Sequence, residues 1–293
     1  MNTFLLLVSI AGATAFWVNN RWASKAGART EAYCFWLILF TTLFSGILAA
    51  ILHQSVTGSY LWTIGGISGI SYVIGMGLVM YGLKAGPAGP TVAINNMGLL
   101  WPVVISIIWL KPRIPSFALC AGIIIVCTAV VALSLMRSEK TASTDPTPST
   151  DKPVSKLWSI AMLGLWFAAG TTMGSQAIGA TRLAASPFAL CFAFNLVATL
   201  IIAPFYFRLT PIRIKKSEIL PGLAQGFTQV TTSSAIFLAI PRLGADMVFP
   251  FVVATPIVIM LIIGHFVHKE HITPKAWACC LLGAGGLVLL AVS

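Results

Sequence analysis

The sequence predicts an all-α membrane protein whose ten transmembrane helices form two inverted five-helix repeats. Of its 293 residues, 58% are hydrophobic and 9% are charged, whereas a soluble domain carries about 25% charged residues. The apolar residues form continuous runs of about 20 residues, the length of a membrane-spanning helix. These runs do not alternate as the strands of a membrane barrel would. Landmarks near the ends of the two halves also recur at a nearly constant spacing.

Each expected span is an apolar run bounded by polar or charged residues. Lipid offers no hydrogen-bond partner to the backbone, so runs of this length are expected to be helical. The ten spans are expected at residues 2–20, 32–52, 60–82, 90–110, 115–136, 157–178, 186–207, 219–239, 246–267 and 274–292.

A long polar stretch separates the fifth and sixth expected spans. It is rich in Ser, Thr, Pro and Asp, a composition typical of a flexible, solvated linker. The sequence therefore predicts a first five-helix repeat over residues 1–136, a linker over 137–156 and a second repeat over 157–293.

Two landmarks indicate that the halves are related. Lys84 and Arg242, each after an apolar span, are 158 positions apart (242 − 84). Pro115 and Pro274, each before the last span of its half, are 159 apart (274 − 115). Internal repeats of this kind are typical of transporters that work by alternating access.

The positive charges predict an orientation in the membrane. Loops after odd-numbered spans hold 14 Lys and Arg residues, and loops after even-numbered spans hold 4. By the positive-inside rule, the linker is expected in the cytoplasm and both termini outside, in a multi-pass protein of the inner or plasma membrane. The net charge of +11 thus reflects basic loops that orient the protein in the bilayer. No nucleic acid is expected as a partner.

The sequence offers little for metal binding or catalysis. Its six cysteines lie in apolar segments without the spacing of a metal or disulfide site. His268 and His271 flank Lys269-Glu270 but lack the His-Glu-x-x-His spacing and a third ligand. We therefore expect no metal, no cofactor and no enzymatic activity. A channel would need filter loops or charged rings, which the sequence lacks.

Two stretches carry a family resemblance. The first is Tyr81–Pro90 with the basic turn Lys111–Pro115, and the second copy runs from Leu238 through Pro274. With the span count, these pieces resemble the ten-helix, EamA-like branch of the drug/metabolite transporter superfamily. The resemblance implies two inverted five-helix bundles around a central cavity. It also implies that helices one, three, four, six, eight and nine line the cavity, while helices five and ten lie outside.

The eighth span has the most distinctive polar side chains. Gln225, Gln229 and Thr232 are spaced i, i+4, i+7 and share one helical face. Neutral amides and hydroxyls suit a polar substrate that needs hydrogen bonds rather than a countercharge. The competing interpretation is that they join packed helices, since such contacts contribute about 0.6 kcal/mol on average.

Other polar and aromatic side chains complete the predicted substrate site. Asn20 and Gln176 are amides 156 positions apart (176 − 20) on the first helix of each half, as expected of a site on the twofold axis. Aromatic walls would supply contact area, although Trp and Tyr also serve as interfacial anchors. The further candidates are Tyr72, Asn95, Asn96, Trp101 and Trp166.

None of the seven carboxylates lies in the middle of an expected span. Proton coupling would then fall to Asp246 or His265, near the ends of the ninth span. The small drug exchangers of the superfamily use a membrane-embedded glutamate, which has no match here. We expect a secondary transporter of a small polar or zwitterionic metabolite, such as an amino acid or sugar, acting as a monomer or homodimer. The alternatives are a multidrug efflux carrier and a non-transporting scaffold or receptor.

Overall fold

The computed structural model describes residues 2–85, 94–110, 116–141, 156–183, 186–209, 215–266 and 274–291. Every regular element in these ranges is helical. Residues 94–96 are helical and continue into η1, α5 and η2; we refer to this stretch as segment 94–110. The elements are α1 (Asn2–Lys25), α2 (Thr30–Ile51), α3 (Ser59–Ala85), η1 (Met97–Leu99), α5 (Leu100–Ile105), η2 (Ser106–Leu110), α6 (Phe117–Thr141), α7 (Lys156–Arg182), α8 (Pro187–Leu209), α9 (Lys216–Leu243), α10 (Ala245–Phe266) and α11 (Pro274–Ala291).

The all-α prediction is confirmed, and the described helical stretches coincide with the ten expected spans to within a few residues. Several helices run past the apolar segment because backbone hydrogen bonding continues into polar residues. Five are long and apolar enough to cross a membrane, as expected of a multi-pass membrane protein: Asn2–Asn20, Glu31–Ile51, Ser59–Val79, Leu157–Arg182 and Pro187–Arg208. Crossing by all ten stays a prediction.

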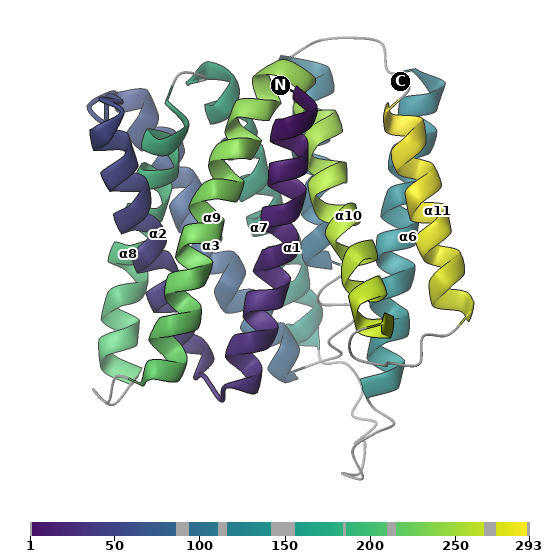
Figure 1. The fold of residues 1–293 in the computed structure, drawn as a ribbon, viewed down its shortest axis with the longest axis horizontal. Coiled ribbons are helices and arrows are strands. Elements are labelled where there is room, and N and C mark those ends of the chain that lie inside the picture. Colours follow the sequence, from purple (N-terminus) through teal and green to yellow (C-terminus); the bar gives the residue numbers. More distant parts are fainter. Residues whose placement is uncertain are drawn as a thin grey trace.

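Successive helical stretches alternate in direction (Figure 1). The contacts agree: Gly12 on α1 faces Thr232 on α9, while Asn19 further along α1 bonds Thr228 further back on α9. We call the end where α1 begins and α11 ends the upper end, and the end where α6 stops and α7 starts the lower end (Figure 1).

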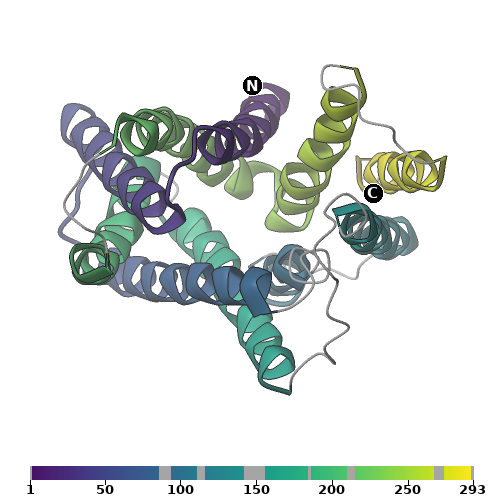
Figure 2. The same ribbon diagram turned by 90° about the horizontal axis from the view of Figure 1, so that it is seen from below.

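The main helix contacts join the two halves of the chain. In one set α1 packs along α9, and α3 packs along α7. In another, α2 packs on both α8 and α9, and α3 packs on α8. Helices α6 and α11 pack on each other at one edge of the molecule (Figure 2). This peripheral position agrees with the expectation that spans five and ten lie outside.

Paired glycines allow two of these contacts to be close. Gly222 and Gly226 on α9 face α2, and Gly65 and Gly69 on α3 face α8. A Cβ atom on Gly226 would lie 2.6 Å from Cβ of Phe40, nearer than two such atoms approach. Small residues spaced four apart are the usual means by which membrane helices come together.

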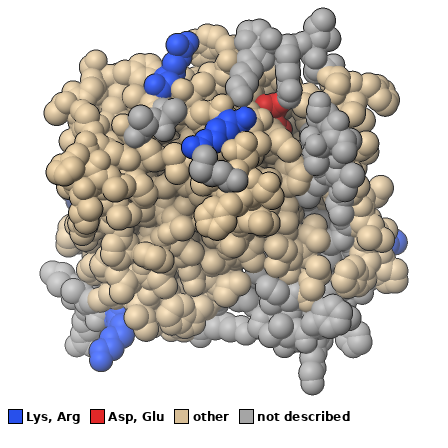
Figure 3. All heavy atoms as spheres, turned by 45° about the horizontal axis from the view of Figure 1, so that its top comes forward, with Lys and Arg blue, Asp and Glu red and all other residues tan. Residues whose placement is uncertain are grey.

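The outer surface is apolar over wide areas. Large side chains such as Phe117, Ile108 and Leu281 are among the exposed residues. Over most of the described part of the face shown in Figure 3, the side chains are neither basic nor acidic. A soluble monomer rarely exposes apolar patches of more than a few hundred Å², so this surface suits contact with lipid.

Candidate functional site

The polar face of α9 formed by Gln225, Gln229 and Thr232 is largely buried in the helix bundle. The side chain of Gln225 is 0% exposed, and neither its Nε2 nor its Oε1 atom has a hydrogen-bond partner among the described residues. Gln229 is half-buried and donates from Nε2 to Oγ of Ser233 at 3.2 Å. Thr232 is buried where Gly12 of α1 comes into contact with it. Among the described residues, therefore, no group uses the hydrogen-bonding capacity of the Gln225 amide.

The irregular segment 94–110 brings two predicted aromatics together. The ring centroids of Trp101 and Trp166 are 5.6 Å apart, and Phe167 lies 5.4 Å from Trp101 and 5.1 Å from Trp166. Trp166 also donates from Nε1 to the backbone oxygen of Met97 at 3.4 Å. These contacts fix segment 94–110 against α7.

The remaining predicted side chains lie in different surroundings. Tyr72 on α3 packs edge-to-face on Phe194 of α8, with centroids 6.3 Å apart. Just before η1, Asn96 is buried and Asn95 half-buried. Gln176 is half-buried on α7. The structure thus groups Trp101 with Trp166 but places Tyr72 against a helix that the family resemblance had not assigned to the cavity.

The amides of α1 link it to its neighbours. Asn20 accepts a hydrogen bond from the Tyr33 hydroxyl of α2 at 2.8 Å. Asn19 donates from Nδ2 to Oγ1 of Thr228 on α9 at 3.1 Å. Both amides therefore have protein partners here, as the packing interpretation requires.

Of the two candidate coupling residues, Asp246 has an evident structural role. It is 3% exposed in the first turn of α10 and accepts a hydrogen bond from Oγ of Ser106 at 2.9 Å. A carboxylate at this place is stabilised by the positive end of the helix dipole. The backbone of His265 belongs to α10, and its side chain lies outside the described residues. Within the described ranges, no three His, Cys, Asp or Glu residues are grouped so as to hold a metal ion.

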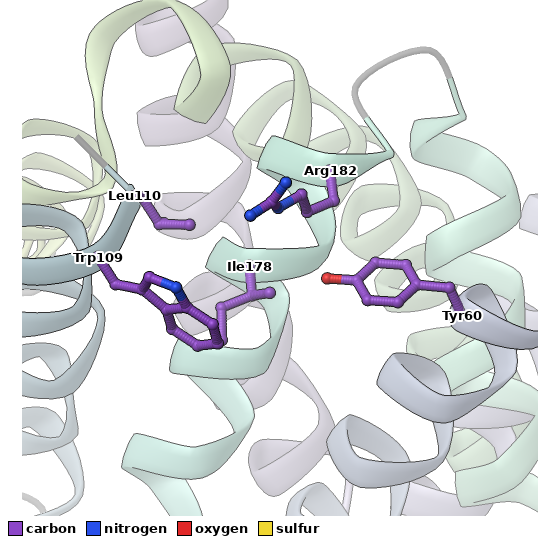
Figure 4. Close-up of a pocket in the computed structure, with 5 residues that line it drawn as sticks. All are labelled: Tyr60, Trp109, Leu110, Ile178 and Arg182. Carbon is purple, nitrogen blue, oxygen red and sulfur yellow. The ribbon is translucent and has the colours of Figure 1, made fainter.

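A cavity of about 330 Å³ opens at the upper end, between α3, η2 and α7. The Tyr60 hydroxyl points from α3 towards the turn of α7 that carries Ile178 and Arg182 (Figure 4). The cavity is lined by Tyr60, Trp109, Leu110, Ile178 and Arg182. A guanidinium, a phenol and an indole can together hold a polar group against an aromatic surface. None of these five side chains stands out in the sequence as a candidate for substrate binding.

Two threonines meet where α2 crosses α8. Their Oγ1 atoms, on Thr42 and Thr199, lie 2.9 Å apart, and both side chains are buried. Beside them, Asn195 donates from Nδ2 to the backbone oxygen of Cys191 at 2.8 Å. The threonine contact is not evident from the sequence, because a helical Thr usually bonds its own helix, as both of these also do.

At the lower end, a buried ion pair joins the start of α2 to the start of α9. The Nε atom of Arg29 lies 2.6 Å from Oε1 of Glu218, and Nη2 lies 3.0 Å from Oε2. The Glu218 side chain is 0% exposed and that of Arg29 27%. The hydrogen bonds from Arg29 lower the pKa of Glu218, and the carboxylate in turn raises the pKa of Arg29.

No family model matches the chain, and no curated protein sequence matches it. Among solved structures, 28 chains match, so the fold recurs. One, described as "Crystal structure of protein", is 16% identical with a TM-score of 0.74, over 99% of this chain and 96% of its own. At this identity, the likeness shows a shared fold over the full length.

Proposed function

We propose that the chain is a secondary transporter built from two inverted five-helix repeats, of the EamA-like branch of the drug/metabolite transporter superfamily. The observation that carries this proposal is that contacts within the structure recur after a constant shift of 157 residues. Such a relation is expected when one folding unit occurs twice in opposite orientation.

The glycine contacts give the clearest case. The spacing from Gly65 to Gly222 is 157 (222 − 65), and that from Gly69 to Gly226 is also 157 (226 − 69). Their partners on the facing helices obey the same shift, from 36 to 193 and from 40 to 197. The four contacts are Gly65–Ala193, Gly69–Val197, Gly222–Trp36 and Gly226–Phe40.

Three further contacts obey the same shift: one is carried onto itself, and the other two are exchanged with each other. Thr42 and Thr199 are 157 positions apart (199 − 42) and touch each other, which is the arrangement expected on a twofold axis. Between α6 and α11, moving each residue by 157 exchanges the contacts Gly283–Ala129 and Gly286–Val126. The shift therefore relates contacts at four helix pairs, namely α2–α8, α2–α9, α3–α8 and α6–α11.

A molecule of this kind has two related conformations. If each half can adopt the shape of the other, exchanging the shapes closes one end and opens the opposite one around a fixed midplane site. Substrate would enter from one side of the membrane and leave on the other. The helix contacts between the halves are the surfaces that would rearrange.

The polar residues indicate the substrate class. Gln225 and Gln229 offer neutral donors and acceptors, and Gln225 has both amide atoms unpaired among the described residues. A small polar or zwitterionic metabolite would satisfy them by hydrogen bonding. The positive charges of the loops support an inner or plasma membrane location with the lower end in the cytoplasm.

A thermal-shift screen of the purified protein tests this function. Sugars, amino acids, nucleosides and cationic drugs would be compared, since a ligand that binds the folded state raises the melting temperature. We expect a neutral or zwitterionic metabolite to raise it, and Gln229→Ala to abolish the shift while leaving expression intact. Thr231→Val, on the exposed side of the same helix, should keep it.

Other outcomes would favour a different function or a different substrate site. A response to cationic drugs alone would favour efflux. A metabolite that stabilises the protein but is not taken up by proteoliposomes would favour a receptor. An unchanged affinity in Gln229→Ala would remove Gln229 from the substrate site.

A further inference from the structure

We infer that Arg29 and Glu218 form a latch that holds the lower end closed in this conformation and separates when that end opens. The inference rests on the proposed alternating access. It assigns a role to two residues that the substrate site does not use.

The geometry of the pair favours a strong contact while α2 and α9 are together and makes Glu218 costly to bury once they part. Both Glu218 oxygens accept hydrogen bonds from the Arg29 guanidinium, at 2.6 and 3.0 Å. Tyr206 and Glu31 also raise the pKa of Arg29, and backbone hydrogen bonds at Arg29 and Lys215 also lower the pKa of Glu218. An ionised carboxylate without its partner is costly to keep buried. Once the helices separate, therefore, Glu218 has to reach water.

The latch joins the two halves at one point. Arg29 immediately precedes α2, in the first half, and Glu218 lies in the first turn of α9, in the second. Any rocking of one half against the other that parts α2 from α9 at the lower end must break both hydrogen bonds. An interaction within one half would not report this movement.

The upper-end positions that correspond to this pair cannot form an ion pair, although Gln54 there accepts hydrogen bonds from the backbone of Phe188 and Ala189 across the two halves. Moving each residue of the pair by 157 positions gives Ser186 (29 + 157) and Leu61 (218 − 157). A serine and a leucine cannot form an ion pair. Leu61 follows Tyr60, which lines the upper cavity.

At the upper end, a cavity lies next to one of the positions that correspond to the ion pair. This cavity of about 330 Å³ lies among Tyr60, Ile178 and Arg182. The positions related to Tyr60 and Arg182 by the repeat are 217 and 25, next to Glu218 and four residues before Arg29 in the sequence. A lower cavity equivalent to the upper one would therefore open at the site of the ion pair.

Hydrogen–deuterium exchange of the purified, lipid-reconstituted full chain tests the latch without any substrate. In Glu218→Gln, we expect backbone exchange about tenfold faster in residues 22–31 and 215–222, together with slower exchange at the upper cavity, in residues 60–66 and 176–183. Arg29→Lys keeps the charge but loses the paired hydrogen bonds, and should change exchange in the same directions by less. Arg208→Gln, at an exposed basic residue in the last turn of α8 at the same end, is the control and should leave both ends unchanged.

The deciding result is whether backbone exchange changes in opposite directions at the two ends. Faster exchange at the lower end with no protection of the upper end would show a purely structural ion pair and overturn the latch. Unchanged exchange at both ends in Glu218→Gln and Arg29→Lys would overturn it equally. Because exchange needs no transport, reciprocal changes in a protein that moves no solute would support the latch and count against the transporter. Transport in a protein whose two ends show no opposite changes in exchange would support the transporter and count against the latch.

Discussion

The buried amide of Gln225 is the residue whose environment most needs a functional explanation. A buried polar group without a partner costs about 1–3 kcal/mol of stability, and this side chain has two such atoms among the described residues. Its place on a polar helical face was predicted from sequence. Its lack of a partner was not, since that depends on side chains of helices far away in the chain.

Replacing Gln225 with leucine separates stability from function. Gln225→Leu conserves most of the side-chain volume and removes the unpaired amide, so we expect the ligand-free protein to be stabilised by about 1–2 kcal/mol. The thermal shift given by the substrate should be lost. Melting temperatures with and without ligand measure both effects. A fall in the stability of the ligand-free protein would mean that the amide is paired in the membrane.

The Glu218 carboxylate makes the lower end sensitive to acid. Its pKa is lowered in the folded protein by hydrogen bonds from Arg29, so its contribution is fully present above the unfolded pKa of about 4.3. That contribution is lost as the pH falls through the lowered value. We therefore expect the gap in melting temperature between the wild type and Glu218→Gln to stay nearly constant from pH 7 down to about 4.3 and to narrow as the pH falls further. A gap that widens with acid would contradict the assignment of the pair.

At the scale of single elements, sequence was a good guide to where helices lie and a poor guide to their regularity. Residues 90–110 were expected to form one span, yet the described part passes through η1 and α5 into the π-helical turn η2. Pro102 removes one helical N–H, and Ser106 bonds Asp246 on α10. The proline is visible in the sequence, but the contact that accompanies the π turn comes from another helix.

The close contact of α9 with α2 leads to a prediction about glycine. In Gly226→Ala, the added methyl group would lie 2.6 Å from Cβ of Phe40 and 3.0 Å from N of Thr41. We expect a loss of about 1–3 kcal/mol, since overpacking forces the helices apart. Gly66 has nothing within 4 Å of the same position, so Gly66→Ala should be neutral or slightly stabilising through helix propensity. Equal melting temperatures for the two variants would show that the α2–α9 contact is loose.

At the scale of the whole molecule, sequence predicted the number and order of the helices but not their partners. Spacings of 158 and 159 between loop landmarks had suggested the duplication, and contacts inside the helices give 157. Loops accept insertions that helix contacts do not, which explains the small difference. Pairings such as α1 with α9 and α3 with α7 join residues far apart in the chain, and one sequence contains no direct record of them.

If the chain is the twofold-related carrier proposed above, whether a cross-link blocks transport should depend on the position of the cross-link. Exchanging the conformations of the two halves carries the pair Thr42–Thr199 onto itself, so the distance between its members is the same in both states. The pair Arg29–Glu218 is carried onto Leu61 and Ser186, so its separation changes.

In a variant without native cysteines, we expect oxidation of the Thr42→Cys/Thr199→Cys pair to leave proteoliposome uptake at about the level measured under reducing conditions. Oxidation of Arg29→Cys/Glu218→Cys should abolish uptake, and a reducing agent should restore it. Uptake blocked by the central cross-link would place the axis elsewhere, and uptake that survives the lower cross-link would mean that α2 and α9 stay together throughout the cycle.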